Sequence, residues 1–135
     1  MARTKRISMI RMLALGSSMV AAGLIGGGSV ASAREDDVIN TGSCSGSTDW
    51  KLKGHPDHGR IQLEFEIDSN ISGQNWNVTL KQDGTAFFHG QRTTQGPSGS
   101  FEVSRRPDDM PGTHHFVGRA VNPATGEVCR GSVDI

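Results

Sequence analysis

The feature that most constrains the fold is the strict alternation of apolar and polar residues over Arg60–Asp68. Every second position in this segment holds a large apolar side chain: Ile61, Leu63, Phe65 and Ile67. Successive side chains of a strand point to opposite faces of the sheet, so a period of two indicates a strand with one buried face and one solvated face. The rest of the chain must therefore supply other apolar faces to cover this one.

Six further segments alternate in the same way and are separated by residues typical of turns. They are Asp49–Lys53, Asn75–Gln82, Thr85–Thr93, Ser100–Arg106, His114–Val121 and Glu127–Ile135. No segment beyond the N-terminal region keeps a helical period. Seven short strands without a helix predict an all-β chain that folds as a seven-stranded antiparallel β-sandwich.

Two hairpins can be placed from their turns. Asp83-Gly84 is a strong hairpin signal, but it allows two registers, with Phe87 opposite Leu80 or with Phe88 opposite Val78. The sequence does not decide between them.

The last hairpin turns through Asn122–Gly126. Pairing Asn122 with Glu127 places Ala120 opposite Cys129 on the inner face. The same register places Arg119 directly opposite Arg130 on the outer face.

Residues 1–33 have the pattern of a secretory signal peptide. Four basic residues precede an uncharged, largely apolar stretch that ends in Ala31-Ser32-Ala33. An uncleaved membrane anchor is the alternative, but the many glycines and serines disfavour a permanent spanning helix. We therefore expect a signal-peptide helix, a flexible tail over residues 34–47, a sandwich domain over residues 48–135, and a secreted protein.

Export would change the charge balance of the chain. It leaves 102 residues, with 10 basic and 14 acidic side chains and a net charge of −4. Nucleic-acid binding usually needs a basic excess, so the composition argues against nucleic acid as a partner. The exported form has no segment expected to enter a membrane.

Both cysteines, Cys44 and Cys129, follow the expected cleavage site. In an exported domain they allow one intramolecular disulfide, which would close a long loop and stabilise a small core. Two free thiols are the alternative, but the chain has no Cys-x-x-Cys pattern.

The expected strand layout resembles immunoglobulin-like and fibronectin-III-like domains, and Trp76 falls on the third strand, where immunoglobulin domains keep their core tryptophan. The chain departs from the pattern in its cysteine positions and in having no tyrosine. It is also similar to small uncharacterised secreted proteins of actinobacteria, through Cys44–Ser47, Pro97–Phe101 and Thr125–Gly131. That resemblance implies export but no particular activity.

Three histidines could hold a metal: His55 and His58, with Asp57 between them, and His114. Pro56 interrupts the first pair and no helix fixes its spacing, so a solvated loop is the simpler interpretation. We expect no cofactor.

No motif indicates an enzyme, because the chain lacks Gly-x-Ser-x-Gly. Glu64 and Glu66 resemble a catalytic carboxylate pair, but Lys51 and Lys53 are expected beside them on the neighbouring strand.

The most informative surface is the outer face of the last hairpin. Arg119 and Arg130 repel each other there unless their long side chains diverge into water or pair with Glu127 and Asp134. Lys81 would join this face if its strand is a neighbour. We therefore predict a secreted binding module whose ligand the sequence does not identify; an acidic cell-surface polymer and an extracellular protein are the candidates. The rival hypotheses are a secreted inhibitor or effector acting through an extended loop at Thr93–Gly99, and a small metal-binding protein or enzyme.

Overall fold

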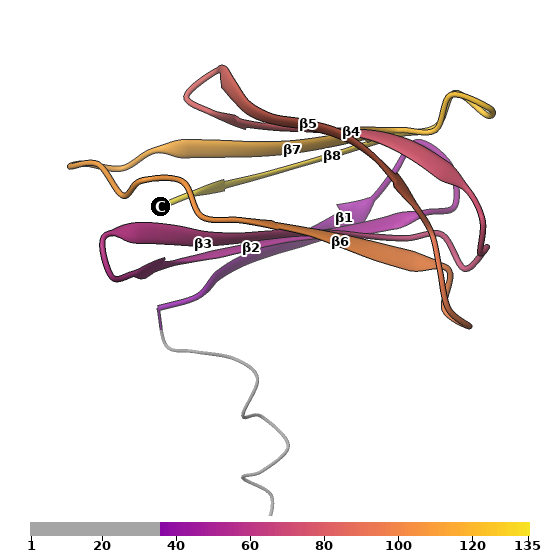
Figure 1. Cartoon of the computed structure of the whole chain (residues 1–135), viewed down its shortest axis with the longest axis horizontal. Coiled ribbons are helices and arrows are strands. Elements are labelled where there is room, and N and C mark those ends of the chain that lie inside the picture. The colour runs from indigo at the N-terminus through magenta and orange to yellow at the C-terminus, as the bar shows by residue number, and fades with distance from the viewer. Residues whose placement is uncertain (1–35) are drawn as a thin grey trace, which may run out of the picture. The chain divides into compact units, whose positions relative to one another are not determined.

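The computed structural model describes residues 36–135, so the predicted signal peptide lies outside the described residues. This part of the chain contains strands and no helix (Figure 1). The strands are β1 (Val38–Ser43), β2 (Asp49–Asp57), β3 (Arg60–Asp68), β4 (Asn75–Gln82), β5 (Thr85–Thr93), β6 (Ser100–Arg105), β7 (His115–Val121) and β8 (Val128–Asp134).

The strands form two antiparallel sheets that lie face to face, as Figure 1 shows. The first sheet has the order β1-β2-β3-β6 and the second has the order β5-β4-β7-β8. The prediction of an all-β sandwich is confirmed, with eight strands rather than seven.

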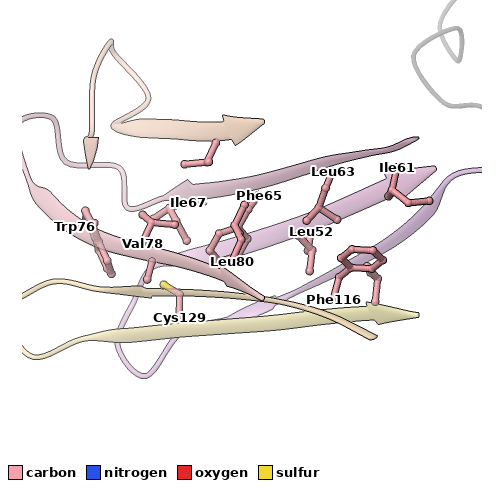
Figure 2. Close-up of a cluster of buried hydrophobic side chains, with 13 residues drawn as sticks. Leu52, Ile61, Leu63, Phe65, Ile67, Trp76, Val78, Leu80, Phe116 and Cys129 are labelled. Atoms are coloured by element: carbon pink, nitrogen blue, oxygen red, sulfur yellow. The ribbon is translucent and has the colours of Figure 1, made fainter. Parts of the chain in front are cut away.

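The core fills the space between the sheets (Figure 2). The four alternating apolar residues of β3 all face inward and are at most 1% exposed. Trp76 on β4 is fully buried among them, as are Phe116 on β7 and Cys129 on β8. Each sheet therefore covers the apolar face of the other, which is the main source of stability in this architecture.

The predicted tail over residues 34–47 is wrong, because Val38–Ser43 forms the edge strand β1. It pairs with β2 from Val38↔Gly54 to Ser43↔Asp49. The Asn40 side chain also donates a hydrogen bond of 2.6 Å to the Ser132 carbonyl of the other sheet. Backbone pairing and side-chain contacts hold this segment, and a sequence poor in apolar residues gives little sign of either.

The solvated loop expected around His55 and His58 is also wrong, because the strand expected to end at Lys53 continues as β2 to Asp57. Only His58 and Gly59 form the turn, with φ of 54° and 80°. Pro56 is tolerated because β1 pairs with β2 only as far as Gly54, so no strand needs its missing N–H on that side.

Neither expected register of the β4–β5 hairpin is observed. Asp83-Gly84 forms a two-residue turn with Gln82 opposite Thr85, but a bulge then places Phe88 opposite Leu80. The extra residue is Phe87, so two consecutive phenylalanines reach the interior side of the sheet. Phe87 makes an edge-to-face contact with Phe116 at 6.5 Å.

Glycines let Trp50 lie close to the backbones of two strands from different sheets. A Cβ at Gly42 on β1 would lie 2.8 Å from the Trp50 ring, and a Cβ at Gly131 on β8 would overlap it. The indole therefore fills a slot that exists because both positions lack a side chain.

We expect Gly131→Ala to lower the free energy of unfolding by about 1–3 kcal/mol, because the added methyl must displace the Trp50 ring. Denaturant unfolding followed by circular dichroism measures the change. Ser132→Ala, at the next and outward-facing position, is the control and should change stability by less than about 0.5 kcal/mol. Equal effects of the two substitutions would show that the ring is not confined.

Candidate anion-binding face

The segment before the first residue of β2 is fixed to the last strand by a covalent and hydrogen-bonded connection. Cys44 and Cys129 form a disulfide, as predicted. The Glu127 carboxylate accepts hydrogen bonds from the Gly46 and Thr48 amides, at 3.0 and 2.9 Å, and from the Thr48 hydroxyl at 2.9 Å. We call this group of contacts, made by residues 44–48 with Glu127 and Cys129, the clasp. It commits Glu127 to the loop, so this carboxylate does not neutralise the neighbouring arginines.

The last hairpin has the predicted register. Arg119 on β7 lies directly opposite Arg130 on β8, and Ala120 lies opposite Cys129. Both arginine side chains point away from the core and are exposed.

Lys81 belongs to the same face, as the sequence predicted for adjacent strands. β4 is the neighbour of β7, with Lys81 opposite Val117 and Thr79 opposite Arg119. The next strand outward, β5, places His89 opposite Thr79. The basic face is here defined as Lys81, His89, His115, Arg119 and Arg130, together with Thr79 and Val117 between them.

The basic face surrounds a hollow of about 410 Å³ on the outer side of the β5-β4-β7-β8 sheet. Its lining is Thr79, Lys81, Gly84, His89, His115, Val117, Arg119 and Arg130. This lining contains no carboxylate, and all five basic side chains are exposed.

The acidic groups near this face are held by other partners. Asp134 accepts a hydrogen bond of 2.6 Å from the Nδ1–H of His115. Asp83 accepts hydrogen bonds from the backbone amide of His115 and from the ring of His114. Within residues 36–135, no ion pair joins Arg119, Arg130 or Lys81 to a carboxylate. Three cations are therefore left to interact with solvent or a ligand.

The opposite sheet presents a different electrostatic surface. The expected Lys–Glu pairs are present there, with 3.7 Å between Lys51 Nζ and Glu66 Oε1 and 3.4 Å between Lys53 Nζ and Glu64 Oε1. Glu102 lies directly opposite Glu66, and burial together with the charges of Glu64 and Glu66 raises the pKa of Glu102. This outer face carries excess negative charge, so the two sides of the sandwich are electrically unlike.

The candidate metal ligands do not come together. His55 Nδ1 lies 2.8 Å from Asp37 Oδ1, and His58 lies beside Asp57 at the β2–β3 turn. His114 contacts Asp83 instead. Residues 36–135 contain no group of three histidine, cysteine or acidic side chains arranged to hold a metal ion.

The loop proposed for an inhibitor is closed rather than extended. Gln95 pairs with Ser100, which folds the segment back on itself. Thr94 exchanges backbone hydrogen bonds with the preceding loop through Gln74 and Gly73. The segment between Gln95 and Ser100 is therefore a short turn rather than an extended loop.

Sequence reasoning missed His89, His115 and Thr79 as members of the face. Their alternation with apolar neighbours places them outward, but only the strand order brings β5, β4 and β7 side by side. The pairing register of the β4–β5 hairpin would have placed His89 opposite Thr79, but this register depends on the bulge at Phe87.

Comparisons with family models, with curated proteins and with solved structures gave no match for this chain. No helix within residues 36–135 is long and apolar enough to cross a membrane.

The contacts of His114 favour the charged form of its ring. Its Nδ1 lies 2.5 Å from Asp83 Oδ2 and its Nε2 lies 3.0 Å from the Pro111 carbonyl. Both partners only accept hydrogen bonds, so both ring nitrogens must donate. These hydrogen bonds raise the pKa of His114 above its ordinary 6.5, and the His115 amide and the His114 ring lower the pKa of Asp83 below 3.8.

We expect the coupling free energy between Asp83 and His114 to be greatest between about pH 4 and pH 6.5. This range lies above the ordinary pKa of Asp83 and below that of His114, so both side chains are charged in the folded and in the unfolded protein. The coupling is lost as pH rises through the raised pKa of His114, and as pH falls through the lowered pKa of Asp83. A double-mutant cycle of Asp83→Asn and His114→Gln, measured by thermal unfolding at several pH values, gives this coupling. A coupling that stays constant from pH 5 to pH 9 would contradict the charged pair.

Proposed function

We propose that this protein is an exported binding module that holds an acidic ligand on its basic face. The observation that carries the proposal is the pair of arginines, Arg119 and Arg130, which lie directly opposite each other without a carboxylate partner in residues 36–135. Like charges at opposed positions of a sheet destabilise it. A bound anion removes that repulsion and gains charge-assisted hydrogen bonds.

The surroundings of the pair support binding rather than a purely solvated surface. Lys81 and His115 extend the positive region, and the hollow is large enough to receive more than one anionic group. Glu127 and Asp134, the two carboxylates that could have neutralised the arginines, bond to the clasp and to His115.

Export is part of the same proposal. The disulfide between Cys44 and Cys129 suits an oxidising compartment, and the basic N-terminal segment followed by an uncharged stretch fits a secretory signal. An extracellular location would bring the basic face to acidic polymers of a cell surface.

We also propose an immunoglobulin-like or fibronectin-III-like layout, which the strand order supports. The chain passes from β3 to β4, from β5 to β6 and from β6 to β7 by crossing between the sheets. Sandwiches of this kind commonly present binding surfaces on one sheet or on their loops.

We expect Arg119→Ser/Arg130→Ser to weaken binding to an acidic polymer by tenfold or more, because two charge-assisted contacts are lost. The measurement is retention of the purified, disulfide-bonded protein on immobilised polygalacturonate and on immobilised lipoteichoic acid at low salt. Binding of the unchanged protein should weaken as salt is added.

Lys51→Ser/Lys53→Ser is the matched control, because it removes the same charge from the opposite sheet. This variant should be retained like the unchanged protein. Equal retention of all three proteins on both polymers would contradict the proposal that the basic face is the binding site. An equal loss of retention in both double variants would contradict it as well.

A further inference from the structure

We propose that the ligand of the basic face is a linear polyanion that runs across the four strands of the second sheet. This inference rests on the proposed function and specifies the class of ligand. It follows from one row of side chains, His89, Thr79, Arg119 and Arg130, in which each residue comes from a different strand.

The pairing register defines this row. Thr79 on β4 lies opposite His89 on β5 and opposite Arg119 on β7, and Arg119 lies opposite Arg130 on β8. Neighbouring strands of a sheet are about 4.8 Å apart, so the row is roughly 14 Å long from the first strand to the last. It runs at right angles to the strands and crosses the whole sheet.

The row has cationic or hydrogen-bonding groups along its full length. Arg119 and Arg130 form one end, and His89 stands at the other, where its Nδ1 lies 3.0 Å from the Thr79 hydroxyl. Lys81 and His115 lie to one side of the row and line the same hollow. A ligand with one anionic group would use only the arginine pair, whereas a chain with regularly spaced anions could contact every strand.

The composition of the face favours a polar polymer over a folded protein or a lipid surface. Protein interfaces usually depend on aromatic or large aliphatic anchors, and membrane-binding surfaces need exposed apolar side chains. Valines such as Val117 are the largest aliphatic residues on this outer face, and no Phe or Trp points outward from its strands. Among residues 36–135, the exposed large hydrophobic residues are Ile39, Ile71 and Met110, none of which lines the hollow.

A length series tests the inference. The probes are oligogalacturonates, which carry carboxylates, and oligomers of glycerol phosphate, each from one to six units, measured by calorimetry at low salt. We expect the affinity in at least one series to rise with each unit until the oligomer spans the row and then to level off, with a tetramer bound tenfold or more tightly than a monomer. The series that shows this rise identifies the anion as carboxylate or phosphate.

A matched pair of variants tests the direction of the chain. His89→Ala removes the far end of the row, and Gln91→Ala changes the next outward-facing residue of β5, off the row. We expect His89→Ala to weaken binding of the long oligomers and to leave the shortest ones unaffected, while Gln91→Ala changes neither. Loss of long-oligomer affinity in Gln91→Ala but not in His89→Ala would overturn the proposed path.

The outcomes also separate this inference from the proposed function. Monomers that bind as tightly as hexamers, in a manner that needs Arg119 and Arg130, would overturn the linear polyanion and leave the anion site standing. Binding of an acidic folded protein through the same arginines, without binding of either oligomer series, would also overturn it. Failure of every acidic ligand to bind would remove the proposed function itself.

Discussion

The position of the last hairpin depends on the clasp, which joins the segment before β2 to the start of β8. Core packing holds the two sheets face to face, but the disulfide and the Glu127 hydrogen bonds fix one edge of the sandwich. Cys129 is immediately followed by Arg130, so the same connection positions the outer face of the last hairpin. Successive side chains of a strand point to opposite faces, so Cys129 faces the clasp and Arg130 faces solvent.

The clasp also explains why the surface stays unbalanced. Glu127 lies close in sequence to Arg130, yet three hydrogen bonds to Gly46 and Thr48 hold it on the loop. Several hydrogen bonds to one carboxylate outweigh an exposed ion pair, which contributes about 0–1 kcal/mol. The Glu127 hydrogen bonds thus stabilise the loop of residues 44–48, but they leave the repulsion between Arg119 and Arg130 without compensation. Local conflicts of this kind are expected at functional sites.

The sequence predicted the features that depend on local pattern. Alternation located β3 and the core side of β4, and the turn at Asn122–Gly126 gave the register that places Arg119 opposite Arg130. It failed where tertiary contacts decide the structure. Val38–Ser43 has few apolar residues but pairs with β2, and the bulge places Phe87 against Phe116. The row across the sheet needs strand order, which no local pattern contains.

Trp50, whose ring fills the slot between Gly42 and Gly131, is an intrinsic fluorescence probe of this part of the structure. The chain has two tryptophans and no tyrosine, and they occupy separate places. Trp76 is sealed in the core, whereas Trp50 is partly exposed and touches one strand from each sheet. Its emission therefore responds to separation of the clasped edge, and that of Trp76 to loss of the whole core. Opening of one edge and global unfolding can be distinguished in the native chain without an added label.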